Sequence, residues 1–220
     1  EEDTIDGFGY NLDSDDNNND DAHGPLKFLI LPSSLKKIES QAFLSQSLMG
    51  MIEIPDGVEY IGGGAFAYNY LSGSIKLPSS LKILDRGAFY GNAAISGQLY
   101  LPEGLEKIGK SDYYGNGGAI FSETHLTGPL ILPSSLVQVT SLLGFTGTTG
   151  TVTIPPKLTY VPWYLMSNSG CTAVEFHDGI IEINDCAFEN SSLSGELVLP
   201  PNLKYIAGSA FARSKISSII

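Results

Sequence analysis

The chain has 220 residues, of which 42% are hydrophobic, with 25 glycines and 12 prolines, a composition typical of a folded and turn-rich protein. Its formal net charge of −12 argues against a basic surface for nucleic acid, and no apolar run is long enough to span a membrane. The charge is uneven, because residues 1–24 carry nine acids and no Lys or Arg, which leaves 15 acids against 12 bases in the rest.

The acidic first segment, residues 1–24, is predicted to be a disordered tether ahead of a folded domain at residues 25–220. A polar run of one sign has little apolar surface to bury. Residues 13–21 (D-S-D-D-N-N-N-D-D) do resemble the first half of a calcium loop. However, Asn18 stands where such a loop needs Gly, and Gly24 stands where it needs a bidentate Glu. We therefore favour a solvated tether and predict no metal site.

A repeated unit organises the remainder of the chain. It begins at a proline preceded by Leu or Ile, with Leu three residues later and Ile or Leu six residues later in most units. The anchor positions are Pro32, Pro55, Pro78, Pro102, Pro133, Pro155, His177 in place of proline, and Pro200. They lie 22 to 24 residues apart, except for one spacing of 31. Self-similarity at such a period predicts a solenoid, in which each unit buries its apolar face against its neighbours.

Short strands are predicted before the anchors, because every second residue there is apolar. These segments are Ser74–Leu77, Gln98–Leu101, Pro129–Leu132, Thr151–Ile154 and Glu196–Leu199. After each anchor, apolar residues three apart fit either a second short extended piece or an irregular turn, and the pattern does not separate the two. An Ala-Phe pair follows, as in Ala65-Phe66 and Ala88-Phe89. It favours a single α or 3₁₀ turn, because the segment is too short for a regular helix.

The unit L-P-x-x-L-x-x-I-x-x-x-A-F-x-x-x-x-L-x-G-x-I-x-L-P resembles the BspA-type leucine-rich repeat, a family of bacterial surface and secreted proteins. The resemblance covers about residues 25 to 220. It implies an α/β fold, a right-handed solenoid of about eight units with a parallel inner sheet and short helical turns. Leu142-Leu143 and Leu165-Met166 replace Ala-Phe in the fifth and sixth units, where we expect less aromatic packing.

The longer fourth unit carries its extra residues in Gly109–Gly118, G-K-S-D-Y-Y-G-N-G-G. Insertions in repeat arrays form loops, often on the binding face. Tyr113 and Tyr114 beside four glycines offer adaptable aromatic contact area, so we include both as candidate binding residues. A tolerated surface loop without a role is the alternative interpretation.

A continuous outward face follows from the strand pattern. If the residues one and three before each anchor point inward, those two and four before it point outward. Candidate binding residues on this face are Lys76, Gln98, Tyr100, Ile131, Thr151, Thr153 and Glu175. The resemblance places it on the inner, concave sheet, where leucine-rich repeats commonly bind. A second row, ranked lower, comprises Lys37, Tyr60, Ile83, Lys107, Gln138, Tyr160, Glu182 and Tyr205.

Catalysis finds little support in the pattern of reactive residues. The three histidines occupy unrelated positions in the repeat, and none has a partner at metal-ligand spacing. Cys171 and Cys186 fall at different phases of successive units, which favours free thiols over a disulfide. We expect no enzyme activity and no cofactor.

The predicted function is recognition of a protein or a glycan, host-derived in one interpretation, by a cell-surface or secreted adhesion protein. The alternative is a structural spacer that associates end to end through apolar first and last strands. The resemblance also implies export, with membrane attachment only through a lipid outside this chain, as in a lipoprotein. No signal peptide or lipid-accepting Cys is visible in the sequence itself.

Overall fold

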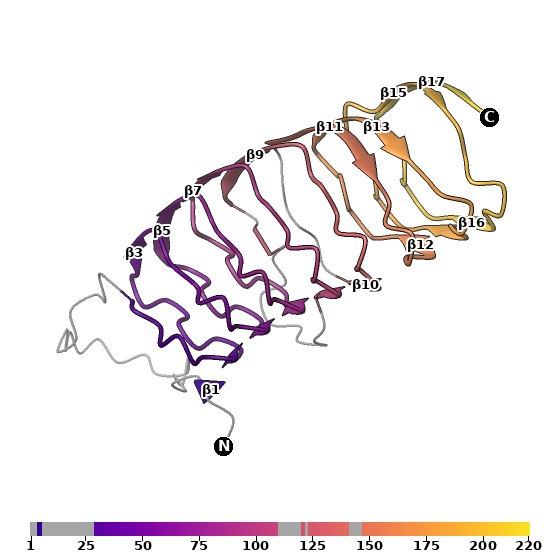
Figure 1. Ribbon diagram of the computed structural model, residues 1–220. Coiled ribbons are helices and arrows are strands. Elements are labelled where there is room, and N and C mark those ends of the chain that lie inside the picture. Colours follow the sequence, from indigo (N-terminus) through magenta and orange to yellow (C-terminus); the bar gives the residue numbers. More distant parts are fainter. Residues whose placement is uncertain (1–3, 6–28, 110–119, 122, 141–146) are drawn as a thin grey trace, which may run out of the picture.

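The chain winds into a stack of coils that progresses along one axis from the N-terminal to the C-terminal end (Figure 1). The computed structural model describes residues 4–5, 29–109, 120–121, 123–140 and 147–220. The parallel-strand solenoid predicted from the repeat is confirmed.

Strands along one side of the stack form the first sheet, in which parallel neighbours follow the order of the chain. Its six strands are β3 (Met49–Gly50), β5 (Tyr70–Gly73), β7 (Ala94–Gly97), β9 (His125–Gly128), β11 (Gly147–Thr153) and β13 (Gly170–Glu175). A separate pair, β15 (Ser194–Leu197) and β17 (Lys215–Ile219), lies farther along the same side (Figure 1). The first sheet therefore stops at β13, although the coils continue.

Most of these strands end at a glycine corner, which corrects the predicted boundaries. The sequence predicts strands at Ser74–Leu77 and Gln98–Leu101, but β5 and β7 end just before them, at Gly73 and Gly97. Both glycines have a positive φ, 77° and 87°, and this conformation turns the strand and ends its regular pairing. The predicted segments lie beyond the corner, where only isolated residues pair. Pro129–Leu132 likewise follows β9, and only parts of Thr151–Ile154 and Glu196–Leu199 lie in β11 and β15.

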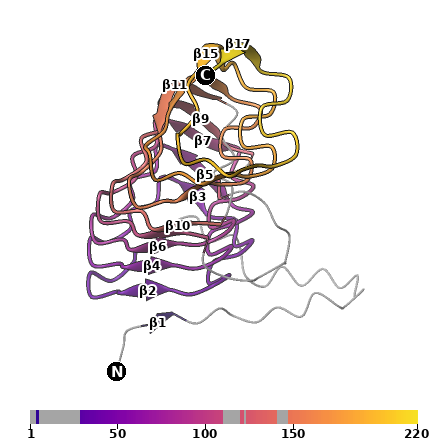
Figure 2. The same cartoon turned by 90° about the vertical axis from the view of Figure 1, so that its right-hand side faces the viewer.

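Two-residue strands on another side of the stack form a six-stranded and a three-stranded parallel sheet, which we together call the second sheet. They are β2 (Lys37–Ile38), β4 (Tyr60–Ile61), β6 (Ile83–Leu84), β8 (Lys107–Ile108) and β10 (Gln138–Val139), then β12 (Tyr160–Val161), β14 (Glu182–Ile183) and β16 (Tyr205–Ile206). β1 (Thr4–Ile5) pairs with β2. Figure 2 shows this sheet along the edge of the stack. The sequence left two alternatives for the segment after each anchor, a short extended piece or an irregular turn. The structure has the short extended piece.

The predicted helical turns are wrong, because the structure contains no helix in the residues that it describes. Around each Ala-Phe pair the backbone N–H groups alternate between two kinds of acceptor. Phe66 donates to the carbonyl of Ala88 in the next coil at 2.8 Å, whereas Ala67 donates to Gly64 of its own turn at 3.0 Å. A helix needs successive N–H groups to bond within the segment. Hydrogen bonds between coils therefore take the place of the hydrogen bonds that a helix would form. The helical component of the predicted α/β class is wrong for the same reason.

Phenylalanine rings run through the interior of the stack. Phe43, Phe66, Phe89 and Phe121 stack in succession, with ring centroids 5.3 to 5.4 Å apart. Phe188 and Phe211 stack in the same way near the C-terminal end. In the sixth unit Leu165 and Met166 are buried at the Ala-Phe position, whereas Leu142-Leu143 lies outside the described residues.

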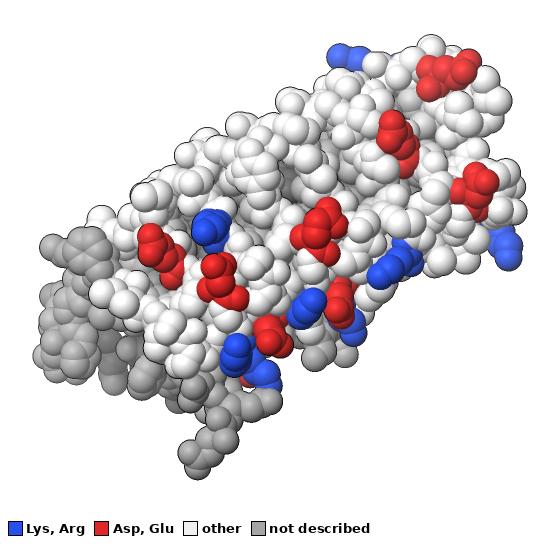
Figure 3. Space-filling view, viewed as in Figure 1, with Lys and Arg blue, Asp and Glu red and all other residues white. Residues whose placement is uncertain are grey.

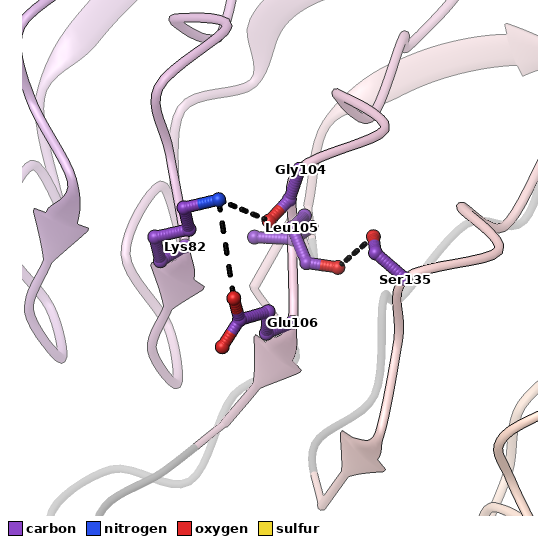
Figure 4. Close-up of polar contacts among 5 residues, drawn as sticks. All are labelled: Lys82, Gly104, Leu105, Glu106 and Ser135. Atoms are coloured by element: carbon purple, nitrogen blue, oxygen red, sulfur yellow. Dashed lines mark hydrogen bonds and ion pairs between the residues drawn. The ribbon is translucent and has the colours of Figure 1, made fainter.

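Polar contacts also join neighbouring coils beside the second sheet (Figure 4). Lys82 Nζ lies 3.4 Å from the carbonyl oxygen of Gly104 and 3.9 Å from Glu106 Oε1. Ser135 Oγ donates to the carbonyl of Leu105 in the preceding coil at 2.6 Å. Because both charged side chains are about half exposed, their ion pair contributes little to stability, on the order of 0 to 1 kcal/mol.

Candidate functional site

The predicted outward face is exposed, and it follows the corners of the first sheet. We call Lys76, Gln98, Tyr100, Ile131, Thr151, Thr153 and Glu175 the strand face. All of them are exposed except Gln98, which is half-buried, and Tyr100 and Ile131 are 66% and 60% exposed. The alternating neighbours, such as Leu99 and Leu132, are buried. Tyr113 and Tyr114 lie outside the described residues, so their predicted role is untested.

Backbone and side-chain contacts bring members of the strand face together. Lys76 bridges to Tyr100 in the next coil, and the Tyr100 hydroxyl donates to Gln98 Oε1 at 3.0 Å. Thr153 pairs with Glu175, and its hydroxyl donates to Glu175 Oε2 at 2.7 Å. These are two local clusters within one row. The second predicted row is less accessible, because its residues are half-buried in the second sheet except for exposed Tyr205.

In Figure 3 charged side chains gather along the lower edge of the stack, where basic and acidic groups alternate, and stand singly over the rest of this side. Lys and Arg do not form a continuous stripe on this side. Exposed Tyr and Ile among charges of both signs give a surface suited to a protein partner rather than to a phosphate backbone.

A cleft separates β13 from β15, where the first sheet is interrupted. Within the described part of the chain, β13 pairs only with β11, and β15 pairs only with β17. The two coils remain joined at the ends of the cleft: Ser192 N donates to Ser169 O at 3.1 Å, and Asn202 Nδ2 donates to Asp178 O at 2.9 Å. The cavity between the strands measures about 340 Å³, which is within the range of ligand sites.

Apart from Ser194, the side chains around this cleft are apolar or acidic. The apolar lining comprises Ala173, Val174, Phe176, Leu193, Leu197, Val198, Leu199, Pro200 and Pro201, and the acidic lining comprises Glu175, Asp178 and Glu196. The lining contains no Lys, Arg or His. Glu175 belongs both to the strand face and to the cleft, so the two surfaces are continuous.

Chemically reactive groups do not assemble into a centre in the described part of the chain. No three His, Cys, Asp or Glu side chains there lie together as a metal site would require. Cys171 and Cys186 are free thiols, and burial is the main cause that raises the pKa of each. His177 holds a corner through contacts of its ring nitrogens with Pro155 O and Gly179 N, both at 3.1 Å.

The coil pattern matches a known family. The model of the BspA type leucine-rich repeat region matches residues 22–141 and 117–220, with six copies of the repeat. The chain belongs to this family. No curated protein matches this chain. The described residues also include no helix that is long and apolar enough to cross a membrane.

Solved bacterial leucine-rich repeat structures are similar to this BspA-type array in fold. YopM from Yersinia enterocolitica is 21% identical with a TM-score of 0.54; the match covers 89% of this chain and 37% of that one. A leucine-rich repeat protein from Bacteroides ovatus is 22% identical with a TM-score of 0.47, covering 86% of this chain and 64% of the other. This chain thus spans less than two thirds of the length of either relative.

Sequence reasoning missed one structural feature of the BspA-type units, a polar side chain three residues after the phenylalanine. Asn92 Oδ1 accepts from Leu71 N at 3.1 Å, and its Nδ2 donates to Phe66 O and to Phe89 O, both at 2.9 Å. Asn69 makes the equivalent contacts one coil earlier. The recurrence of Asn, Thr or Ser at this position is visible in the sequence and could have revealed it.

The cleft was also missed in this BspA-type array. Its only sequence signal is the sixth repeat boundary, where His177 replaces the anchor proline and Phe176 replaces the preceding Leu or Ile. Phe176 packs edge-on against Phe188, with centroids 6.3 Å apart. The change of residue is visible in the sequence, but the separation of the strands is not.

Proposed function

We propose that this BspA-type leucine-rich repeat protein binds a protein partner through its strand face and acts at the bacterial surface. The observation that carries the proposal is the exposure of Tyr100 and Ile131 in one row of an ordered, parallel framework. Tyr is a typical anchor of protein interfaces, the exposed Ile adds apolar contact area beside it, and the surrounding polar groups would form the rim.

Other exposed side chains extend this row toward the N-terminal coils. Met51 is 73% exposed and Ile30 is 92% exposed, and both stand two or four residues before an anchor, as Tyr100 and Ile131 do. A single exposed apolar side chain needs no explanation, but a series of them in register across coils supports an interaction surface.

Location at the cell surface rests on the family alone, and so does attachment through a lipid outside this chain. A host protein is the partner class that such a location makes available. A glycan fits less well, since sugars favour clustered aromatic faces and Tyr100 is the only aromatic member of the described strand face.

The experiment compares two double variants. Tyr100→Glu with Ile131→Glu places two charges on the strand face, and Tyr205→Glu with Val137→Glu places two at exposed positions beside the second sheet. Immobilised protein is exposed to host serum or mucosal extract, and the captured proteins are compared. We expect a protein captured by the wild type and the second variant to be lost only with the first. Equal capture by all three would contradict a role of the strand face.

The same variants address the spacer alternative. Solution mass is measured by light scattering for each. Under the proposal the mass is unchanged by the strand-face substitutions. If the wild-type chain associates and the strand-face variant captures the same proteins as the wild type, the spacer function is favoured instead.

A further inference from the structure

The cleft between β13 and β15 exposes backbone hydrogen-bonding groups as well as side chains. Ile154 N donates to Glu175 O at 3.0 Å, so the backbone of Glu175 faces β11. Backbone groups of successive residues in a parallel strand point to opposite sides, so the N–H and C=O of Val174 face β15.

The opposite wall has the same property. Ile220 N donates to Leu197 O at 2.9 Å, and Leu199 N donates to Ile220 O at 2.8 Å. The backbone groups of Leu197 and Leu199 therefore face the chain of β17 and its next residue, Ile220. By the same alternation, the backbone of Val198 faces β13. The structure records no pairing of β13 with β15. Two parallel strand edges with available donors and acceptors therefore face each other across the cleft, which is the arrangement that accepts an added strand.

The negative charge of the cleft lining favours a ligand of positive charge. Glu175, Asp178 and Glu196 line it without a basic residue, and no described ion pair involves them. Glu175 Oε2 does accept a hydrogen bond from Thr153, which leaves its charge uncompensated. An anionic ligand would be repelled. The chain's own residues 1–24 are also excluded, because they carry nine acids and no Lys or Arg.

The shape and lining favour a peptide over a sugar. Phe176 is the only aromatic lining residue, and its ring is half-buried against Phe188, so it offers little face for stacking. Val174 and Val198 offer apolar contact for small side chains of an extended chain. A volume of about 340 Å³ accommodates a short segment rather than a folded domain.

We propose that the cleft between β13 and β15 binds an extended, lysine- or arginine-containing peptide segment of a protein partner by strand addition. The segment bonds through its backbone to Val174 and Val198, and its basic side chains lie beside Glu175 and Glu196. This inference rests on the proposed function, because it assumes a protein partner, and it names the chemistry of one segment of that partner.

The probe is a fluorescein-labelled, acetylated and amidated heptapeptide of alternating Lys and Val, with binding measured by fluorescence anisotropy. A peptide with Glu in place of Lys tests the charge, and one N-methylated at alternate residues tests the backbone bonds. We expect the Lys peptide to bind, the Glu peptide not to bind, and N-methylation to weaken binding about tenfold through loss of two hydrogen bonds. Binding of the Lys peptide should also fall with added salt.

The matched protein variants keep side-chain shape and remove charge. Glu175→Gln with Glu196→Gln removes two of the three negative charges of the cleft and leaves Asp178, whereas Glu182→Gln with Glu189→Gln makes the same charge change elsewhere. We expect the first to weaken binding of the Lys peptide about five- to tenfold and the second to change it less than about twofold. The amide signals of Val174 and Val198 should shift on binding in NMR spectra.

Two results would overturn the inference. One is absence of binding by the Lys peptide to the wild-type chain; the other is equal binding by the cleft variant and its control. Neither bears on the strand face, which the Tyr100 and Ile131 substitutions test with a different readout. Loss of protein capture by that variant with unchanged peptide binding would support both proposals.

Discussion

The N-terminal and C-terminal halves of the stack follow one repeat but differ in continuity. From β2 to β10 the second sheet is unbroken, and the rings from Phe43 to Phe121 form one column. Beyond Val139 the second sheet is interrupted before β12, and the first sheet is interrupted after β13. The comparison shows that neighbouring coils stay hydrogen-bonded to each other even where one of the sheets is interrupted.

The polar position after the phenylalanine shows the same contrast. Asn69 and Asn92 each bond to the backbone of the preceding coil as well as to their own turn. Ser169, Ser191 and Ser214 each donate only to the carbonyl three residues earlier in their own turn. The shorter side chain does not reach the neighbouring coil, and Thr124 likewise donates to Phe121 O in its own turn, so among the described residues this connection is made by the asparagines.

The largest expected effect comes from breaking the ring column. Phe89→Ala should lower the free energy of unfolding by about 3–5 kcal/mol, because the ring is fully buried between two others. Phe211→Ala should cost less, about 2 kcal/mol, since that ring is partly exposed and has one stacking neighbour. Urea unfolding curves of both variants test the order. A larger loss for Phe211→Ala would contradict the comparison.

Asn92→Ser should have the next largest effect. It leaves the buried N–H of Leu71 without its acceptor and removes the bond to Phe66 O, at a cost of about 2 kcal/mol. The matched change Ser191→Ala removes one bond within a turn and should cost about 1 kcal/mol. Equal destabilisation by the two substitutions would show that the asparagine does not connect the coils.

A tyrosine hydroxyl bridges the interruption between β10 and β12. Tyr160 Oη accepts from Val139 N at 3.0 Å and donates to Val139 O at 3.1 Å. Tyr160→Phe should therefore cost about 1–2 kcal/mol and speed hydrogen exchange of the Val139 amide. Tyr205→Phe, at an exposed position in β16, serves as the control and should change neither. An unchanged exchange rate of the Val139 amide would mean that the Tyr160 hydroxyl does not take the place of the missing backbone hydrogen bonds between β10 and β12.

The smallest effect concerns the surface of the N-terminal half. The Tyr90 hydroxyl donates to Glu123 Oε1 at 2.9 Å, and this bond is the main cause that raises the pKa of Tyr90 from 10.0 to about 12. A raised folded-state pKa favours the protonated phenol, so its small contribution to stability is present below pH 10 and is lost between about pH 10 and 12. Glu123→Gln should lower the pKa of Tyr90, measured by NMR titration. A titration unchanged by this substitution would contradict the assignment.

Much of the fold could be predicted from the sequence, because alternation before each proline directly reflects which side chains are buried. Ile52 and Ile54 are buried while Glu53 between them is exposed, as the pattern indicates. The helical turn could not be excluded, since Ala-Phe is compatible with a helix and only the neighbouring coil shows where the backbone donors go. The strand boundaries were also misplaced, because alternation shows which side chains are buried but not where a glycine with positive φ ends the regular pairing.

The candidate site was predictable only where it follows the repeat. The strand face depends on the period, so the exposure of Tyr100 and Ile131 could be expected. The cleft depends on a departure from the repeat at Phe176 and His177, and a one-dimensional pattern does not show whether such a departure is absorbed by repacking or separates two strands. Tyr113 and Tyr114 remain a prediction.

Amide hydrogen exchange measured residue by residue by NMR tests the difference between the halves most directly. We predict slow exchange for ladder-bonded amides in β5, β7 and β9, and fast exchange for Val174 and Val198, whose N–H groups face the cleft between coils that stay stacked. Protection of Val174 and Val198 equal to that in β7 would mean that β13 and β15 pair in solution. It would contradict both the interrupted sheet and the peptide site built on it.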